Sequence, residues 1–528
     1  MKRNDMVARL ETGGNSDLLV IGGGATGLGI AVDAAARGYR VLLAERNDFA
    51  HGTSSRSTKL VHGGVRYLRR GNLALVREAL LERDILRRNA PHLVHELAFV
   101  VPSYAWWESP FYGAGLKAYD FLAGRHGFGA SRHLSVAEVE AAIPTIATAG
   151  LHGGTLYYDG QFDDARLALA LARTAAGEGA TLVNYCEAVD FCKDAGGRIV
   201  GAVLRDRESG REHAVAARAV INATGPFCDA LRRLDHPDAP PIIAPSQGVH
   251  VVLDQRFLPG EAALMVPNTA DGRVLFAIPW HHCLLVGTTD TPIAVVRTEP
   301  LATEAEIDFL LATLNRYISR PARRDDVRSV FTGIRPLVRA PSARTTADLA
   351  RDHSLFAHPA SGLITITGGK WTTYRRMAED TVNFAAQAAG LPKRPCTTRA
   401  LPIHGACRDH RSFGALAHYG SDAPAIVDLV RQDSRLGEKF HPRLPAIAAE
   451  VVWACRHEMA RTVEDVLSRR TRSLLFDFRA AAEAAPAVAR LMAAELGRDT
   501  AWEQLQSAAF QTLAAIYQGN RGAAAGRS

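Results

Sequence analysis

The sequence predicts a mixed α/β (α+β) protein with a parallel-stranded first part, an antiparallel sheet in the middle and a helical C-terminal part. Three observations predict this fold class. Over residues 17–45 a strand, a glycine turn, a helix and a second strand follow one another. From Gln247 to Asp290 short apolar runs alternate with turns, as in an antiparallel sheet. Beyond Pro395 the chain becomes rich in Ala, Arg and Glu, with apolar residues at helical spacing.

The length of the chain predicts more than one domain. At 528 residues it is too long for a single hydrophobic core. A hydrophobic content of 47% and a charged content of 22% are typical of ordinary globular proteins. We expect a first unit over residues 16–392, divided into a dinucleotide-binding domain (about 16–96, 161–245 and 340–392) and a substrate or cap domain (about 97–160 and 246–339). A helical domain is expected over 393–520.

Charge, cysteines and apolar runs exclude several classes of protein. The net charge is +7 and no basic run reaches five residues, so we expect no nucleic-acid partner; an anionic small substrate and an anionic lipid surface explain the excess equally well. The seven cysteines show no metal-ligand spacing, which indicates free thiols in a reducing compartment and no metal site. The N-terminus lacks the apolar segment of a signal peptide, and nowhere do 18 apolar residues run together.

The remaining elements are predicted from periodicity and capping residues. Residues 1–15 are expected to be a loose polar leader, and residues 97–160, rich in aromatics, Gly and Pro, an irregular surface insertion. The expected regular elements are, in order, a strand at 18–21, a helix at 30–37, a strand at 39–43, a helix at about 72–89, a helix at 165–176 capped by Asp163-Asp164, strands within 180–225, a strand at 363–367 and a helix from about Thr373.

The glycine turn carries the pattern of a dinucleotide site. In Gly22-x-Gly24-x-x-Gly27 the first glycine permits a tight turn, the second lets the backbone approach a pyrophosphate, and the third lets the helix and strand pack closely. Glu45 ends the second strand, where an acid accepts hydrogen bonds from a ribose hydroxyl. The strand, turn, helix and terminal Glu together predict a Rossmann-type domain for NAD or FAD, and Glu45 argues against the 2′-phosphate of NADP.

A longer set of segments resembles one family. The string from Thr53 to Tyr67 (TSSRSTKLVHGGVRY) is similar to the signature of FAD-dependent, quinone-linked glycerol-3-phosphate dehydrogenases. The resemblance covers roughly residues 17–380, and the stretch from Glu458 to Arg461 also resembles the C-terminal domain of that family. The other matching segments, in the same order as in the family, are 163–167, 222–226, 278–280, 287–290, 333–337, 351–352 and 368–375.

The resemblance implies a cofactor, a fold and a reaction. The cofactor is FAD, and the fold is a Rossmann-type FAD-binding domain with an antiparallel-sheet substrate domain, as in amino-acid oxidases, followed by the helical domain. The implied reaction oxidises sn-glycerol 3-phosphate to dihydroxyacetone phosphate and passes the electrons to a quinone. The residues implied to bind the cofactor are Gly22, Gly24, Gly27, Glu45, Thr53, Ser54, Ser55, Lys59, Leu60, His62, Gly63, Gly64, Ala223, Thr224, Gly225, Gly369, Lys370, Thr372 and Thr373.

Cations are needed to hold a phosphorylated substrate, and Arg suits this because its fork binds phosphate oxygens bidentately. The resemblance implies that Arg66, Arg335, Arg351 and Lys370 surround the substrate. Tyr67 either hydrogen-bonds the substrate or packs.

Oxidation of a secondary alcohol needs a base for the hydroxyl proton and a hydride acceptor. His62 is a candidate for the base, or else a structural hydrogen-bonding residue, and Arg335 could instead lower the pKa of the alcohol. Negative charge develops near N1 of a reduced flavin, and the loop Gly368-Gly369-Lys370 could supply donors to it. The alternative for that loop is helix capping by Thr372 or Thr373. We therefore expect His62, Arg335 and Lys370 to be catalytic.

The electron acceptor must reach the flavin itself, because the chain has no second dinucleotide motif and no iron–sulfur cysteine pattern. A quinone lies in the membrane, so we expect peripheral attachment, on the inner face of the cytoplasmic membrane, of an otherwise cytoplasmic protein. Six apolar side chains beside Lys117 and Arg125 suit an interfacial patch, although they could equally form a core. These are Trp106, Trp107, Phe111, Tyr112, Leu116 and Phe121.

Other functions remain open at this stage. A glycerol-3-phosphate oxidase would pass electrons to oxygen, and an amino-acid or hydroxy-acid oxidoreductase could use the same scaffold. A flavin-binding regulatory protein without turnover is a further alternative, from a different class. The C-terminal helical domain could contribute to a homodimer or merely cover the core.

Overall fold

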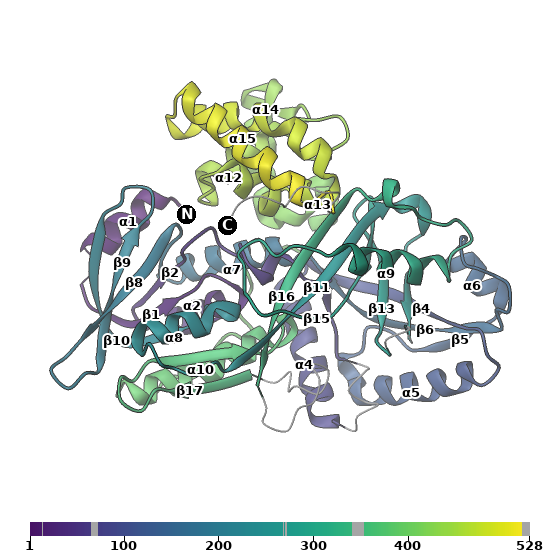
Figure 1. Ribbon diagram of the computed structural model, residues 1–528, viewed down its shortest axis with the longest axis horizontal. Coiled ribbons are helices and arrows are strands. Elements are labelled where there is room, and N and C mark those ends of the chain that lie inside the picture. Colours follow the sequence, from purple (N-terminus) through teal and green to yellow (C-terminus); the bar gives the residue numbers. More distant parts are fainter. Residues whose placement is uncertain (13, 65–71, 268, 270–271, 340–352, 520–528) are drawn as a thin grey trace.

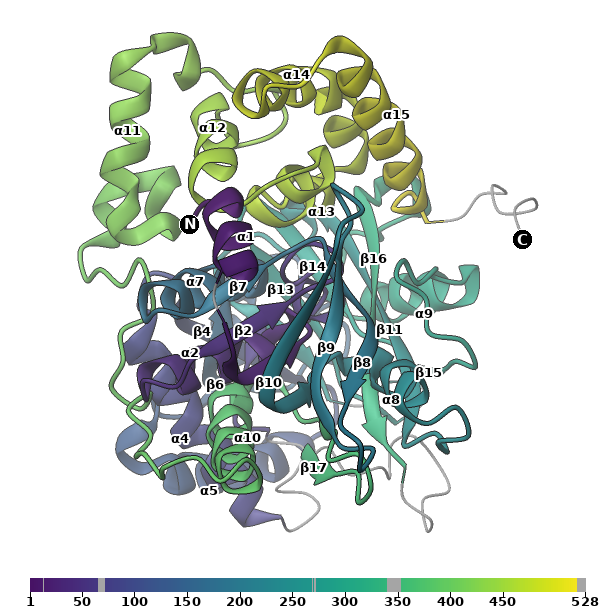
Figure 2. The same ribbon diagram turned by 90° about the vertical axis from the view of Figure 1, so that its left-hand side faces the viewer.

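The computed structural model describes residues 1–12, 14–64, 72–267, 269, 272–339 and 353–519. Two β-sheets lie side by side, and a group of helices from the C-terminal part of the chain lies across one end of both (Figure 1). In the view at right angles the same helices form a separate layer above the sheets (Figure 2). The predicted fold class is confirmed.

The first sheet is the parallel sheet that the glycine motif predicts. Its order among the described residues is β17-β18-β10-β1-β2-β7, with β17 antiparallel to the parallel rest. The central strand contains the apolar run at 18–21, which is buried on both faces as expected for a parallel sheet. The strands are β1 (Ser16–Ile21), β2 (Val41–Ala44), β7 (Thr181–Val183), β10 (Glu212–Asn222), β17 (His353–Ala357) and β18 (Ile364–Gly368).

Strand β10 has three partners, of which β18 pairs in parallel with its last two residues. Its second half pairs with β1 in parallel, whereas its first half pairs antiparallel with β9 (Ile199–Asp206), which in turn pairs with β8 (Cys186–Lys193). Three helices pack together against the parallel strands: α2 (Ala25–Ala36), α7 (Asp164–Gly177) and α10 (Tyr374–Ala388). Asp163 caps α7 by accepting a hydrogen bond from the amide of Arg166, as the sequence predicts.

The second sheet is mostly antiparallel and, among the described residues, has ten strands. Its main path is β15-β11-β14-β13-β12-β4-β6-β3, with β16 on β11 and β5 on β6. The strands are β3 (Leu60–Val61), β4 (Val94–Ser103), β5 (Arg132–Leu134), β6 (Gly153–Phe162), β11 (Ile243–Asp254), β12 (Ala263–Val266), β13 (Leu275–Trp280), β14 (Cys283–Gly287), β15 (Thr291–Pro292) and β16 (Ser329–Val338). The predicted antiparallel sheet over 247–290 is confirmed.

Two predictions about irregular segments are wrong. Residues 97–160 are regular, because β4 and β6 pair with each other over their whole length as strands of the second sheet. Residues 1–15 contain helix α1 (Arg3–Thr12), which is fixed by buried Met6 and Leu10 and by the ion pair of Arg3 with Asp206, 2.7 Å apart.

Further helices pack against the two sheets. Helix α4 (Leu73–Asn89) begins after Asn72, as predicted, and packs against α5 (Glu108–Ala123). Figure 1 shows both on the side of the molecule away from the C-terminal helices. Helices α6 (Val136–Ala142) and α9 (Glu304–Asn315) also contact the second sheet, whereas α8 (Cys228–Asp235) packs against β8 and β10 of the first sheet. In the described part of the chain, every helix is too short or too polar to cross a bilayer.

The predicted C-terminal helices are α11 (Ala423–Gln432), α12 (Ala448–His457), α13 (Ser473–Phe476), α14 (Phe478–Leu496) and α15 (Thr500–Ile516). Buried ion pairs hold this region to the first sheet. Arg166 of α7 binds Glu458 through two hydrogen bonds of 2.8 and 2.7 Å. Asp48, which follows β2, accepts hydrogen bonds from Arg469 and Arg470. Burial opposes the ionisation of Asp48, but the two guanidinium groups lower its pKa below the usual range.

Candidate active site

A cavity of about 660 Å³ lies at the carboxyl ends of β1, β2, β10 and β18, which is where open parallel sheets bind ligands. It extends from the residues that follow β2, through the glycine turn, to the loop that follows β18. Ten of the residues predicted to bind the cofactor line it: Gly22, Gly24, Glu45, Thr53, Ser54, Ala223, Thr224, Gly225, Gly369 and Lys370.

The glycine turn is packed so tightly that side chains do not fit. A Cβ atom on Gly27 would lie 1.9 Å from the carbonyl oxygen of Gly22, and one on Gly22 would lie 2.7 Å from that of Ala223. Gly22 also has a φ of +111°. Helix α2 therefore starts directly against β1, and its N-terminus, with Ala25 and Thr26, lines the cavity, where the partial positive charge of a helix start favours phosphate. Gly27 acts through this packing and does not line the cavity itself. The amide of Ala25 donates to Ser54 Oγ over 2.9 Å.

Glu45 lies at the edge of the same cavity. Its carboxylate accepts hydrogen bonds from the amides of Gly23 (2.6 Å) and Asn47 (2.7 Å), and burial raises its pKa. The acid is thus tied to the glycine turn at one end of the site. A close-packed glycine turn, a helix N-terminus, an acid at the end of β2 and a long cavity fit a dinucleotide.

A second cavity, of about 310 Å³, adjoins the first on the side of the antiparallel sheet. The two share residues of three segments, so a group bound in the first cavity can reach into the second. The shared residues are Thr53, Pro336, Gly368, Gly369, Lys370 and Trp371. Lys370 therefore lies beside both cavities.

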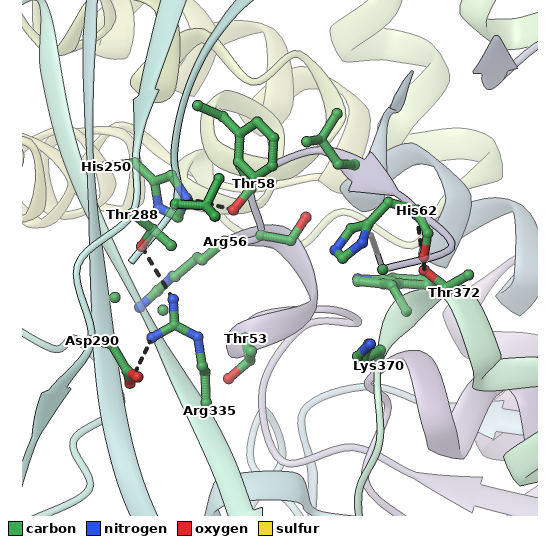
Figure 3. A pocket seen from close by; sticks show the side chains of 18 of the residues that line it. Thr53, Arg56, Thr58, His62, His250, Thr288, Asp290, Arg335, Lys370 and Thr372 are labelled. Atoms are coloured by element: carbon green, nitrogen blue, oxygen red, sulfur yellow. Dashed lines mark hydrogen bonds and ion pairs between the residues drawn. The ribbon is translucent and has the colours of Figure 1, made fainter. Parts of the chain in front are cut away.

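Arg335 enters the second cavity from β16 (Figure 3). Its guanidinium donates to Thr288 Oγ1 (3.2 Å) and to the carbonyl oxygen of Thr289 (3.0 Å), and lies 3.3 Å from Asp290 Oδ1. The side chain is 26% exposed, so it is oriented by these contacts yet accessible from the cavity. These bonds fix the direction of the guanidinium group.

His62 and Thr372 lie across the cavity from Arg335, near Lys370 (Figure 3). His62 follows β3, and its amide donates to Thr372 Oγ1 over 3.2 Å. Thr372 and Thr373 do not cap helix α10 with their side chains, so the capping alternative for this loop is not observed. Leu60 and Gly64 also line the cavity.

His250 was not predicted from the sequence. It lies on β11 and lines the second cavity, buried, with its ring stacked on Phe331 at 4.7 Å. Its Nε2 is 2.9 Å from Thr58 Oγ1. Burial, assisted by Arg335 and Lys59, lowers its pKa well below 6.5, so the ring is neutral at physiological pH. The signal for it was a single polar residue in the apolar run at 248–253.

Further lining residues were also missed. Arg56 lines the cavity, but its guanidinium pairs with Glu299 and donates to the carbonyl oxygen of Thr298 over 3.0 Å. The acids are Asp159 and Asp290. An apolar wall completes the cavity; it consists of Phe99, Tyr157, Met265, Val274 and Phe276.

Several predicted residues lie elsewhere. Lys59, which was predicted to bind the cofactor, lines neither cavity, and its ammonium is buried against Asp164 (2.7 and 2.8 Å) and the carbonyl oxygen of Ser55 (2.7 Å). Ser55, Gly63 and Thr373 are also absent from the lining of both cavities. Arg66, Tyr67 and Arg351 lie outside the described residues.

Comparison with known proteins agrees with this geometry. Residues 17–375 match the model of the FAD dependent oxidoreductase family, and residues 364–503 match that of the C-terminal domain of alpha-glycerophosphate oxidase. The mitochondrial glycerol-3-phosphate dehydrogenase of Rattus norvegicus is 41% identical over 96% of this chain and 74% of its own length. The human enzyme of the same name is 40% identical over the same shares.

A solved structure shows the same fold. The glycerol-3-phosphate dehydrogenase from Bacillus halodurans, complexed with FAD, is 31% identical and has a TM-score of 0.79, covering 98% of this chain and 97% of its own. The cofactor of this protein is FAD. The chain belongs to the FAD-dependent oxidoreductase family and, within it, to the glycerol-3-phosphate dehydrogenases.

Proposed function

We propose that this protein oxidises sn-glycerol 3-phosphate to dihydroxyacetone phosphate and reduces a membrane quinone. In this reaction a side chain of the cavity would take the proton of the C2 hydroxyl group as the C2–H bond is broken. Two electrons and two protons then convert the quinone to a quinol, so that the overall reaction balances. The bound FAD supplies the hydride-accepting chemistry.

One observation carries the proposal: Arg335 and Lys370 line the cavity that adjoins the dinucleotide cavity. A phosphoryl group needs fixed cations, and the fork of Arg binds two of its oxygens. Because Asp290 and Thr288 hold the guanidinium in place, little side-chain freedom is lost when the substrate binds. The similarity to glycerol-3-phosphate dehydrogenases over 96% of the chain supports the choice of substrate.

We propose that the residues divide the work as follows. Arg335 binds the phosphoryl group, and Arg66, Tyr67 and Arg351 remain proposed contacts of the substrate. Lys370 and the amides after β18 meet the negative charge that develops during hydride transfer, since they lie at a helix start beside both cavities. His62 is the proposed proton acceptor; His250, neutral and in the same cavity, is the second candidate.

We propose that the quinone is reached from a membrane surface on which α5 lies. Trp106 and Phe121 are 79% and 82% exposed, and Trp107 and Phe111 are about half exposed, although Leu116 belongs to the core. Lys117 and Arg125 are exposed beside them. Aromatic rings next to cations suit the interface of an anionic bilayer. The proposed location is peripheral, on the inner face of the cytoplasmic membrane.

The test is an anaerobic titration of the purified flavoprotein. Substoichiometric sn-glycerol 3-phosphate is expected to bleach the visible absorption of the flavin, while glycerol, lactate and glycine at the same concentration are not. For the same bleaching, Arg335→Ala should need at least roughly 100-fold more substrate, because two charge-assisted hydrogen bonds to the phosphoryl group are lost. The matched control is Arg431→Ala, on the exposed surface of α11. Faster bleaching by an unphosphorylated substrate would overturn the proposal.

A glycerol-3-phosphate oxidase is the second candidate, favoured by the match of residues 364–503 to the C-terminal domain of alpha-glycerophosphate oxidase. The two differ in the second half-reaction. After reduction by substrate, the flavin is mixed either with a short-chain quinone or with air-saturated buffer. Reoxidation by quinone at a rate far above that by oxygen, without stoichiometric peroxide, is expected; the reverse would identify an oxidase.

A further inference from the structure

Helix α5 has a second side that faces the active site. Tyr119 lies on this helix and is 2% exposed, although Phe121, two residues away, is 82% exposed. The hydroxyl group of Tyr119 accepts a hydrogen bond from the amide of Gly63 (2.9 Å) and donates one to Asp159 Oδ2 (2.9 Å). Gly63 stands between His62 and Gly64, which both line the substrate cavity.

We propose that Tyr119 is a positioning residue for the reaction: its hydroxyl group fixes the His62–Gly64 segment in the wall of the substrate cavity. This inference rests on the proposed function. Tyr119 touches neither cavity; it acts through the peptide that it holds.

The direction of both hydrogen bonds is set by charge. Asp159 accepts from Arg83 over 2.6 Å as well as from Tyr119. Burial, reinforced by the charge of Asp159, raises the pKa of Tyr119 well above 10, so the phenol keeps its proton. Since the proton points to Asp159, an oxygen lone pair faces the amide of Gly63.

The framework around Tyr119 is rigid. The other end of the Arg83 guanidinium donates to the carbonyl oxygen of His126 (3.0 Å), just after α5, and stacks on Phe128 at 4.0 Å. A small core of Val76, Leu80, Tyr119 and Ala123 joins α4 to α5. The hydroxyl group therefore has a fixed position to which the segment is tied.

The segment is tied at two successive amides. The amide of His62 donates to Thr372, next to the Lys370 loop, and the amide of Gly63 donates to Tyr119. A Cβ atom on Gly63 would lie 2.4 Å from the Tyr119 hydroxyl oxygen and 2.5 Å from Leu80 Cδ2. The backbone thus lies directly against α4 and α5. Loss of one of these hydrogen bonds would let His62 shift relative to the substrate. A displacement of about 1 Å can lower a catalytic rate about 100-fold.

The experiment compares Tyr119→Phe with Tyr104→Phe, each purified with FAD. Tyr104 is the matched control, because its hydroxyl group donates to a backbone carbonyl, that of Ala147 (2.7 Å), and it lines neither cavity. Two readouts are taken: the visible absorption spectrum of the bound flavin without substrate, and the rate of anaerobic flavin reduction by sn-glycerol 3-phosphate.

Tyr119→Phe is expected to shift the flavin spectrum and to slow reduction about tenfold, because a buried amide loses its acceptor. Tyr104→Phe should change neither. An unchanged spectrum and rate in Tyr119→Phe would overturn the inference. If the wild type is not reduced by glycerol 3-phosphate but Tyr119→Phe still shifts the spectrum, the proposed function fails and the positioning role stands.

A second variant, Gly63→Ala, keeps the inference testable if Tyr119→Phe folds poorly. Gly63→Ala should give the same spectral shift, because the added methyl group displaces the segment from Tyr119. In the double variant the two effects should be clearly less than additive, since both substitutions break one contact. If the two effects add fully, Gly63→Ala acts through something other than its contact with Tyr119. That result would contradict the positioning role of Tyr119.

Discussion

The positively charged ammonium group of Lys59 is buried in the interior of the protein. Its ammonium and the carboxylate of Asp164 are both fully buried and 2.7 Å apart. Removing one partner of such a pair leaves an uncompensated buried charge. Its place in the family-like string pointed to the cofactor, but its contacts give it a structural role.

Lys59→Met is therefore expected to lower the free energy of unfolding by about 3–5 kcal/mol. Chemical denaturation of the FAD-loaded protein measures this. Adding Asp164→Asn removes the stranded charge and should recover part of the loss. A Lys59→Met protein of normal stability that has lost its FAD would instead restore the cofactor role.

His62→Gln tests the proposed proton acceptor. General-base catalysis contributes roughly 10²–10⁴ in rate, so flavin reduction by substrate should slow by about that factor. Stopped-flow absorbance under nitrogen measures the rate, with His441→Gln, a residue of the C-terminal region that lines neither cavity, as control. A stronger effect of His250→Gln than of His62→Gln would reassign the base to His250.

Single residues were predictable where a local pattern requires them. The glycines at 22, 24 and 27, and Glu45, follow from the βαβ pattern alone, and all but Gly27 line the cavity. His250 and Asp159 were not predictable, because their roles depend on strands that lie far apart in the chain. Their chemistry comes from neighbours such as Thr58 and Tyr119, and no local pattern encodes such contacts.

Helix α5 combines an exposed aromatic face with a buried one, and the exposed face is testable. Trp106, two residues before the helix, extends this exposed face. Trp106→Ser with Phe121→Ser should weaken binding to vesicles of anionic phospholipid at least about tenfold, since each aromatic side chain can bury roughly 150–250 Å². Co-sedimentation with vesicles measures this.

The control for this test is Leu505→Ser, which removes a 66% exposed apolar side chain from α15, in the C-terminal helices. Equal binding of all variants would exclude α5 as the contact surface. Flavin reduction by substrate in solution should stay normal in the double variant, because neither aromatic residue lines the substrate cavity.

Elements were predictable when their own residues decide them. Helices α4 and α7 were predicted because apolar spacing and an N-cap residue lie within the segment itself. The region 97–160 was misjudged because β4 and β6 are strands only through their pairing with each other. Helix α1 was missed since its position depends on the distant Asp206.

For the molecule as a whole, buried neutral histidines predict loss of stability in acid. Burial, with Arg166, lowers the pKa of His92 to about 3. Between pH 6.5 and 3 the unfolded chain binds a proton at this site and the folded protein does not, so stability falls as pH falls. The contribution of His92 to the free energy of unfolding is complete above about pH 6.5, and it decreases by about 1.4 kcal/mol per pH unit below that value.

His92→Gln should lack this component. Between pH 6.5 and 5 the wild type is expected to lose roughly 2 kcal/mol more than the variant in free energy of unfolding. Denaturant titrations at both pH values measure the difference. His250 and His418, whose pKa values are also lowered, contribute equally to both proteins and cancel. Parallel pH curves for the two proteins would contradict the assignment.

The bond between Asp48 and Arg470 has a consequence for biosynthesis. The two residues are 422 positions apart, and Asp48 directly follows the residues that line the dinucleotide cavity after β2. At about 5–20 residues per second, a ribosome needs roughly 20–80 s to travel from one to the other. During that interval the nascent N-terminal sheet carries a carboxylate without its arginine partners. Tight binding of FAD should therefore begin only after nearly the whole polypeptide has left the ribosome.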